Sequence, residues 1–194
     1  MEVLIVVDML NDFVTGKLKT ERAKHIIPNL KRLIQAARAT DVPVIYTNDA
    51  HLQTDSELKK WGEHAMKGTR GAKVIPQLKP GKGDYVLEKR TYSGFFDTEL
   101  DLLLRKLGVD TIILTGLDTN ICVRHTAADG FFRGYRIVVP RDATEALTEQ
   151  DYQQGLAYMK RAYDAEITEI DEIVKRWSRG QNSQPRKELC THTA

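Results

Sequence analysis

Cys122 is the residue of this 194-residue chain whose surroundings most favour a chemical role. It follows an apolar run and the turn at residues 116–120, a pattern that predicts a strand, a tight turn and the start of a helix. Free amides and the dipole at a helix start can lower the pKa of a thiol and can bind an oxyanion. The alternative is a small buried hydrophobic side chain, the more common role of a Cys without such context.

Asp8 and Lys89 could complete the chemistry of such a cysteine. Asp8 directly follows the apolar run at residues 3–7, and Lys89 closely follows the run at residues 85–87. In a parallel sheet, both side chains could reach the crevice that Cys122 faces. A carboxylate can accept the thiol proton, and an ammonium group can stabilise thiolate and carboxylate together. Each residue alone is better explained as a turn cap or a solvated lysine, so the hypothesis depends on all three.

A second group of residues has the composition of a metal site. Asp49, His51 and His64 supply one carboxylate and two imidazoles after the second apolar run. This set suits a divalent ion, Zn²⁺ first and Mn²⁺ or Fe²⁺ as alternatives, with open positions for water or substrate. Glu57 lies in the same region and could be a fourth ligand or a helix-surface acid. Because the spacing is irregular, ordinary surface histidines are the alternative.

Aromatic residues follow the same apolar runs, in segments where a core would not need them. They could form the walls of a pocket for a flat ring and so bind substrate. A hydrophobic lid or a subunit contact is the alternative, above all for the last two. The residues are Phe13, Trp61, Tyr92 and Phe95.

The elements that must position these residues alternate along the chain. Short, mostly non-alternating apolar runs predict strands buried on both faces, at residues 3–7, 42–46, 85–87, 111–114, 136–139 and 166–170. Helical patterns lie between most of them, at about residues 28–37, 98–108, 120–133 and from Thr148 onward. The alternation predicts an α/β fold, a three-layer α/β/α sandwich around a mainly parallel, Rossmann-like central sheet. In such sheets, ligands bind at the carboxyl ends of the strands.

The composition fits one globular domain. With 41% hydrophobic and 29% charged residues and a net charge of +2, we expect a domain over residues 1–179 and a flexible tail over residues 180–194. The charges are interspersed, which argues against a nucleic-acid partner. The first apolar run lacks the features of a leader peptide and is too short to cross a bilayer, so we expect a cytoplasmic protein without a membrane partner. Two cysteines are too few for a disulfide framework.

The segments around the three candidate catalytic residues together resemble the isochorismatase-like cysteine hydrolase superfamily. They read VVDMLNDF at residues 6–13, EKRTYSGF at 88–95 and LTGLDTNICV at 114–123. The similarity extends from about residue 3 to about residue 170. It implies the isochorismatase-like hydrolase fold, with Asp8, Lys89 and Cys122 as catalytic triad. It also implies a cis peptide between Leu117 and Asp118, and an oxyanion hole formed by the amides of Asp118 and Cys122.

Within the superfamily, the motif Asp49-Ala-His51 with His64, and Trp61 three residues before it, resembles the nicotinamidase/pyrazinamidase branch. The resemblance implies an amidohydrolase of NAD salvage that converts nicotinamide to nicotinate and ammonia through a cysteine thioester. The metal would hold the pyridine ring, which Phe13 and Trp61 would flank. Relatives commonly form homodimers or homotetramers, so the same is expected here.

Two other functions remain open. One is another amidase of the superfamily that acts on a carbamoyl or ureido substrate, with the metal region vestigial. The other is a protein without catalytic activity that senses oxidants through Cys122. Metal content would distinguish the first from a nicotinamidase, and turnover of any amide would exclude the second.

Overall fold

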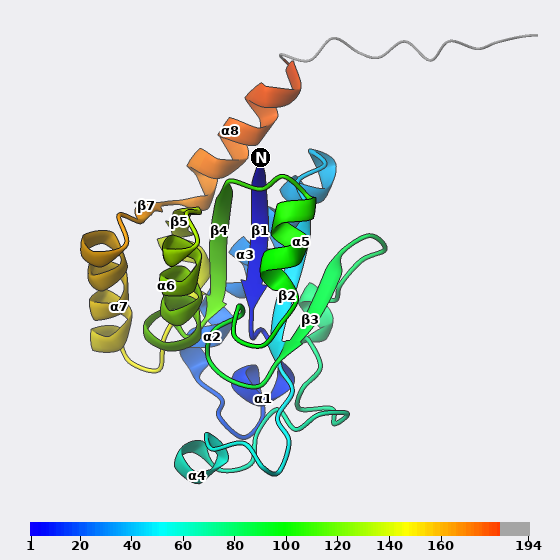
Figure 1. Cartoon of the computed structure of the whole chain (residues 1–194), viewed down its shortest axis with the longest axis vertical. Helices are drawn as coiled ribbons and strands as arrows, with labels where there is room; N and C mark the ends of the chain where they lie inside the picture. Colours follow the sequence, from blue (N-terminus) through cyan, green and yellow to red (C-terminus); the bar gives the residue numbers. More distant parts are fainter. Residues whose placement is uncertain (183–194) are drawn as a thin grey trace, which may run out of the picture.

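A parallel sheet forms the centre of the computed structural model, which describes residues 1–182 (Figure 1). Its strands run in the order β3-β2-β1-β4-β5-β7, and the short β6 pairs with the end of β4. Because neighbouring strands are parallel, their carboxyl ends meet at one edge, the lower edge in Figure 1. The strands are β1 (Glu2–Val7), β2 (Val44–Asp49), β3 (Tyr85–Lys89), β4 (Thr111–Leu117), β5 (Arg136–Pro140), β6 (Thr144–Glu145) and β7 (Glu166–Thr168).

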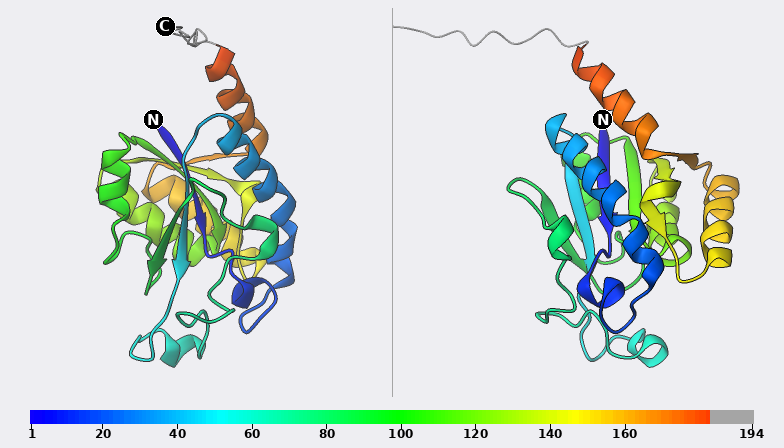
Figure 2. Two further views of the ribbon diagram at one scale, coloured as in Figure 1. Left: turned by 90° about the vertical axis from the view of Figure 1, so that its right-hand side faces the viewer. Right: turned by 180° about the vertical axis from the view of Figure 1, so that it is seen from behind.

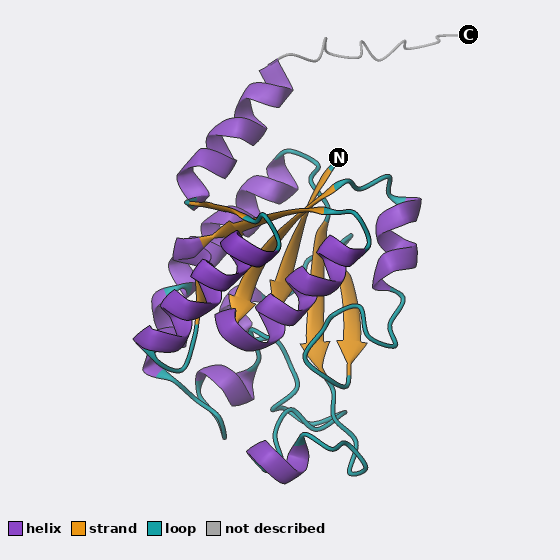
Figure 3. Ribbon diagram, turned by 60° about the vertical axis from the view of Figure 1, so that its left-hand side comes forward, coloured by secondary structure: helices purple, strands orange, loops and turns teal. Residues whose placement is uncertain are grey.

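Helices cover both faces of this sheet, as the side view in Figure 2 and the ribbon in Figure 3 show. Side chains of β1 alternate between the two faces: Leu4 and Val6 pack with α3 and α8, whereas Ile5 packs with α5, α6 and α7. The three-layer α/β/α fold with its parallel sheet is therefore confirmed. The helices are α1 (Asn11–Val14), α2 (Glu21–His25), α3 (Ile27–Ala39), α4 (Leu58–Trp61), α5 (Leu100–Lys106), α6 (Arg124–Phe132), α7 (Glu149–Ala162) and α8 (Ile170–Asn182).

Local capping explains where several helices begin. The Thr148 hydroxyl accepts a hydrogen bond from the Asp151 amide at 3.1 Å, as the sequence predicts for the start of α7. Thr98 accepts from the Leu100 amide at 3.2 Å before α5. The helix predicted from residue 120 begins instead as a π-helical turn (Thr119–Val123) that continues into α6. This turn carries Cys122.

The C-terminal part of the chain differs from the prediction. The strand expected over residues 166–170 ends at Thr168, and Ile170 begins α8, which the sequence analysis did not predict. An apolar stripe on α8 that includes Ile173 and Trp177 packs against α3, so burial of this stripe stabilises the helix. Helix α8 continues to Asn182, so residues 180–182, which the sequence analysis assigned to the tail, are helical. Residues 183–194 lie outside the described part of the chain.

Over residues 1–182, none of the helices combines the length and the apolar character that crossing a bilayer requires.

Candidate active site

The carboxyl ends of adjacent strands bring the predicted catalytic residues together. Asp8 directly follows β1, Asp49 and Lys89 end β2 and β3, and the turn after β4 carries Cys122. The Cys122 sulfur and one carboxylate oxygen each of Asp8 and Asp49 lie within 4.8 Å of one another. The structure thus assembles the three predicted catalytic residues, although their roles in catalysis remain predictions.

Lys89 lies between two carboxylates at the base of this site. Its side chain is fully buried, and its Nζ lies 2.7 Å from Asp8 Oδ2 and 2.5 Å from Asp49 Oδ1. The contact with Asp8 Oδ2 is an ion pair without hydrogen-bond geometry, and Asp8 Oδ1 accepts a hydrogen bond from the Asp49 amide at 2.8 Å. Although burial lowers the pKa of Lys89, the charges of Asp49 and Asp8 raise it well above its ordinary value. Lys89 is therefore an ammonium group.

Asp8 has the properties of a proton acceptor that works near neutral pH. Burial and the charge of Asp49 raise its pKa to about 7, although Lys89 opposes this shift. Its backbone has a φ of +52°, a left-handed conformation that costs energy in residues other than glycine and that clusters at functional sites. The backbone places its carboxylate beside both Lys89 and Cys122.

Cys122 is buried, and this changes the expectation for its thiol. Only 7% of the residue is exposed, and burial raises the pKa of the thiol well above its ordinary value, although Lys89 opposes the shift. The predicted lowering of the pKa by the helix start is therefore wrong, because desolvation outweighs it. A thiol in this state needs a base to remove its proton, and Asp8 is in reach.

The turn between β4 and α6 contains Cys122 and the neighbouring Asp118. The peptide between Leu117 and Asp118 is cis, as the family resemblance implies. The Asp118 carbonyl accepts hydrogen bonds from the amides of Ile121 at 2.9 Å and Val123 at 3.2 Å, which closes the turn. Both Asp118 and Cys122 line the same cavity, so their predicted oxyanion hole faces the place where substrate would bind.

Gly116 is required at the start of this turn. Its φ is +94°, and a Cβ atom there would lie 2.0 Å from the carbonyl oxygen of Val7. Only glycine fits both conditions, so the close approach of β1 and β4 at this point depends on it.

Three buried residues form a candidate metal centre next to Cys122. One ligand atom each of Asp49, His51 and His64 lies within 4.8 Å of the others. His64 Nδ1 donates to the Gly62 carbonyl at 2.8 Å, which leaves its Nε2 free to bind a metal. His51 Nε2 is buried without a hydrogen-bond partner in the described structure, and such an unsatisfied atom is costly unless it coordinates an ion. These donors fit a divalent metal.

Glu57, predicted as a fourth ligand, lies outside this group. It directly precedes α4, and the three ligands that converge do not include it. It lines the same cavity, and its Oε1 is buried without a hydrogen-bond partner in the described part of the chain. Burial raises the pKa of its carboxyl group.

A cavity of about 300 Å³ opens above Cys122 and His64. Three of the predicted aromatic residues line it: Phe13 packs edge-on against His64 at 5.5 Å, and the Trp61 indole donates to the Tyr92 hydroxyl at 3.0 Å. Phe95, the fourth aromatic residue that was considered, instead stacks on Tyr135 in the core. The cavity has the size of a small-molecule site.

The sequence analysis missed several residues around this cavity. Lys17, Leu18 and Lys19 line it from the segment after α1, and Leu147 lines it from the segment before α7. No motif marks these positions. Asp55 was also missed, although its spacing of four residues from His51 within a turn could have indicated a hydrogen bond to the ring.

The fold is a three-layer α/β/α sandwich, and the isochorismatase-like hydrolases share it. The chain belongs to the isochorismatase family, because the isochorismatase domain matches residues 2–172. It is similar to the solved structure of N-carbamoylsarcosine amidase from Thermoplasma acidophilum, with 45% identity, a TM-score of 0.83 and coverage of 88% of this chain and 96% of that chain.

Nicotinamidases are also among the similar structures. Nicotinamidase PncA from Bacillus subtilis shares 30% identity, with a TM-score of 0.83 and coverage of 87% of this chain and 99% of that one. Pyrazinamidase of Pyrococcus horikoshii in complex with zinc shares 28% identity, with a TM-score of 0.81 and coverage of 87% and 98%. Zinc binding is thus known for this structural neighbour.

Proposed function

We propose that this chain is a metal-dependent cysteine amidohydrolase that converts nicotinamide to nicotinate and ammonia. The main support is that the candidate metal ligand His64 and the candidate nucleophile Cys122 line one cavity. Phe13, Trp61 and Tyr92 line the same cavity and offer apolar surfaces to a flat ring. Its volume of about 300 Å³ suits a substrate as small as a pyridine carboxamide.

The proposed reaction has two halves. Asp8 accepts the thiol proton of Cys122, the sulfur attacks the carboxamide carbon, and the amides of Asp118 and Cys122 stabilise the oxyanion. Asp8 returns the proton to the departing nitrogen as the C–N bond breaks, which gives ammonia and an acyl thioester. Asp8 then accepts a proton from water, which attacks the thioester, releases the carboxylic acid and regenerates the thiol.

Lys89 remains protonated throughout and offsets the charge on Asp8 and on the sulfur. Asp49, His51 and His64 would hold a divalent ion, Zn²⁺ in our proposal, which supplies a Lewis acid for the ring nitrogen of the substrate.

A second candidate substrate is an N-carbamoyl amino acid. Lys17 and Lys19 line the cavity, and both side chains are exposed, so they could pair with a carboxylate that nicotinamide lacks. The 45% identity with an N-carbamoylsarcosine amidase also favours this candidate. The scissile bond is again the C–N bond of a terminal –CONH2 group, here part of a urea, so the same attack would give ammonia and a carbamic acid that loses carbon dioxide.

Ammonia release from purified protein tests both candidates. Nicotinamide and N-carbamoylsarcosine are supplied separately, before and after removal of metal by a chelator, with Cys122→Ala as control. Release from nicotinamide that is lost on chelation and in the variant supports the first candidate. Release from N-carbamoylsarcosine alone, with a higher KM in the Lys17→Gln and Lys19→Gln double variant, supports the second. No release of ammonia from either substrate by folded, zinc-loaded protein contradicts both.

The proposal includes a cytoplasmic location and a homodimer or homotetramer, as the sequence analysis predicts. Light scattering coupled to size-exclusion chromatography would measure the mass of the assembly.

A further inference from the structure

The two candidate histidine ligands differ in the partner of Nδ1, the ring nitrogen that would not bind the metal. His64 Nδ1 donates to a backbone carbonyl, that of Gly62, at 2.8 Å. His51 Nδ1 instead lies 3.1 Å from a side chain, the Oδ2 of Asp55. The orientation of the His51 ring therefore depends on the side chain of Asp55, which a mutation can remove, unlike the backbone partner of His64.

Asp55 is fixed by its own turn. Its amide donates to the Leu52 carbonyl at 3.0 Å, and its Oδ2 accepts from the Leu52 amide at 2.9 Å. The carboxylate is buried, with a side-chain exposure of 5%. Its position beside the His51 ring is thus set by the backbone.

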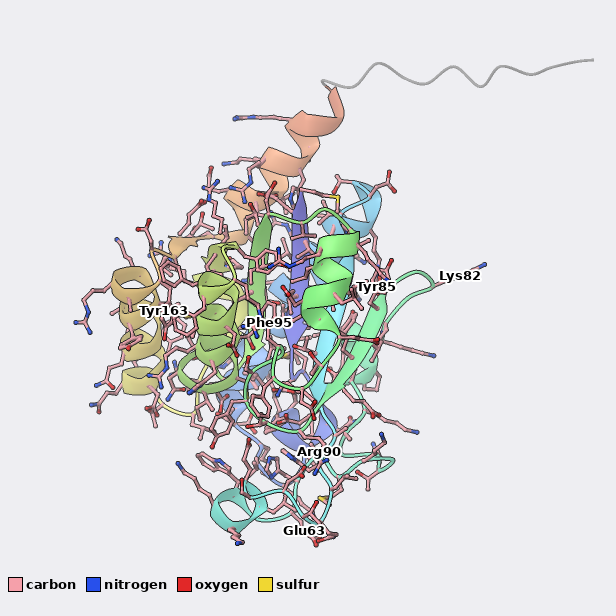
Figure 4. The ribbon with its side chains drawn as sticks, in the orientation of Figure 1. Glu63, Lys82, Tyr85, Arg90, Phe95 and Tyr163 are labelled. Carbon is pink, nitrogen blue, oxygen red and sulfur yellow. The ribbon has the colours of Figure 1, made fainter. Side chains whose placement is uncertain are left out.

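Arg90 holds the other oxygen of the same carboxylate. Its Nε donates to Asp55 Oδ1 at 3.0 Å, and its Nη2 contacts the same oxygen and also donates to Thr54 Oγ1 at 3.2 Å. Arg90 directly follows Lys89 at the end of β3. The end of β3 thus supplies both the buried Lys89 and the arginine that holds Asp55. Figure 4 shows Arg90 below the sheet, on the side where the strands end.

We propose that Asp55, held by Arg90, is a positioning residue that keeps the proton of neutral His51 on Nδ1 and turns the Nε2 lone pair toward the metal. The inference relies on the metal-binding part of the proposed function. The Asp55 carboxylate accepts hydrogen bonds from Leu52 and Arg90 and has no proton to donate. His51 Nδ1 must therefore be the donor in its contact with Asp55, which favours the Nδ1–H tautomer. Without Asp55, the proton could move to Nε2, which lies 3.5 Å from Asp49 Oδ2, and His51 would then be lost as a ligand.

The test is the affinity of the metal-free protein for Zn²⁺, measured by competition with a chromophoric chelator. Asp55→Ala should weaken zinc binding about 10- to 100-fold, the usual effect of losing such a partner. Arg90→Gln should weaken it less, because Asp55 keeps its turn. Glu88→Gln is the matched control: Glu88 pairs with Lys67 at 2.7 Å on the exposed surface of the same strand and should leave the affinity unchanged.

A second readout separates positioning from a general loss of structure. Nitrogen-15 spectra of the metal-free protein, recorded at a pH high enough for His51 to be neutral, should show its Nδ1–H tautomer in wild type and a mixture of tautomers in Asp55→Ala. Zinc affinity equal to wild type in Asp55→Ala, or an Nε2–H tautomer of His51 in wild type, would overturn the inference. If Asp55→Ala fails to fold, unchanged affinity and tautomer in folded Arg90→Gln overturn it.

Neither measurement needs a substrate. A protein that cleaves no amide but whose zinc affinity falls in the variants contradicts the proposed activity and supports this inference. A wild-type protein that binds no zinc overturns the inference.

Discussion

Lys89 Nζ lies 2.7 Å from Asp8 Oδ2, and neither side chain exceeds 2% exposure. The ammonium group is also 2.5 Å from Asp49 Oδ1, so one buried cation balances two buried carboxylates. Charges this far from water are stable only with their partners, since breaking such a pair leaves an uncompensated charge. The same arrangement that serves the proposed chemistry therefore also determines the stability of the protein.

Replacing Lys89 should affect folding as well as activity. Lys89→Gln leaves Asp8 and Asp49 without a cation, and the free energy of unfolding should fall by about 3–5 kcal/mol. Denaturant unfolding would measure this difference. Lys82→Gln is the control, because Lys82 extends from the tip of an exposed loop (Figure 4) and should change the stability by less than about 0.5 kcal/mol. Equal stabilities of the two variants would contradict the electrostatic role of Lys89.

Replacing Cys122 should remove the activity and keep the fold. Cys122→Ala eliminates the sulfur nucleophile, so amide hydrolysis should fall by at least about 10³-fold. Zinc affinity and thermal stability should stay close to those of wild type, since the substitution removes one atom and no ion pair. Cys190→Ala, the other cysteine of the sequence, is the control and should retain full activity. Substantial turnover by Cys122→Ala would rule out the assignment of the nucleophile.

The rate should depend on the ionisation of Asp8. Because burial and then Asp49 raise its pKa to about 7, Asp8 is protonated below that pH and cannot accept the thiol proton. The value of kcat/KM should therefore rise as the pH increases through about 7. Initial rates with saturating zinc between about pH 5 and about pH 8 measure this dependence. A flat profile over this range would show that Asp8 is not the base.

Asp118 should make the stability of the protein depend on pH. Burial, followed by the charges of Asp8 and Asp151, raises the pKa of its carboxyl group to about 7. The folded state then binds a proton more tightly than the unfolded state, whose pKa is about 3.9. The contribution of Asp118 to the free energy of unfolding is therefore most favourable below about pH 4, and this contribution is lost as the pH rises toward about 7.

Asp118→Asn removes this ionisation. The variant should gain thermal stability over wild type, and the gain should be larger at about pH 8 than at about pH 5. Asp41→Asn is the control: Asp41 is exposed and has a φ of +56°, a conformation that Asn tolerates. A Tm difference between Asp118→Asn and wild type that does not change with pH would contradict the raised pKa.

Much of the fold could be predicted because the strands are short apolar runs separated by clear helix caps. The ends of β1, β2 and β3 were marked by Asp8, Asp49 and Lys89, so the side chains at the sheet edge could be identified in advance. The helix α8 was missed because it begins only two residues after β7. Its first apolar residue, Ile170, continues the apolar run of β7 and was therefore assigned to the strand. The strand β6 has only two residues and carries no periodic signal.

Other features depend on contacts that a sequence does not show. Phe95 could have lined the pocket or formed a lid or a subunit contact, but its ring stacks on Tyr135, which lies far along the chain. The pKa of Cys122 was expected to be low from the local helix start, whereas its burial arises from the complete fold. The roles of Lys17 and Lys19 at the cavity depend on how the segment after α1 lies across the site.

The charged residues at the sheet edge and the pocket residue Trp61 belong to different kinds of structure. Asp8, Asp49 and Lys89 lie at the ends of paired strands, while Trp61 comes from the long connection between β2 and β3. Such connections tolerate substitution and insertion far better than the strands of a buried sheet. Changes in this connection during evolution could therefore alter which substrate the cavity accepts. The sheet that positions Asp8 and Lys89 would stay the same.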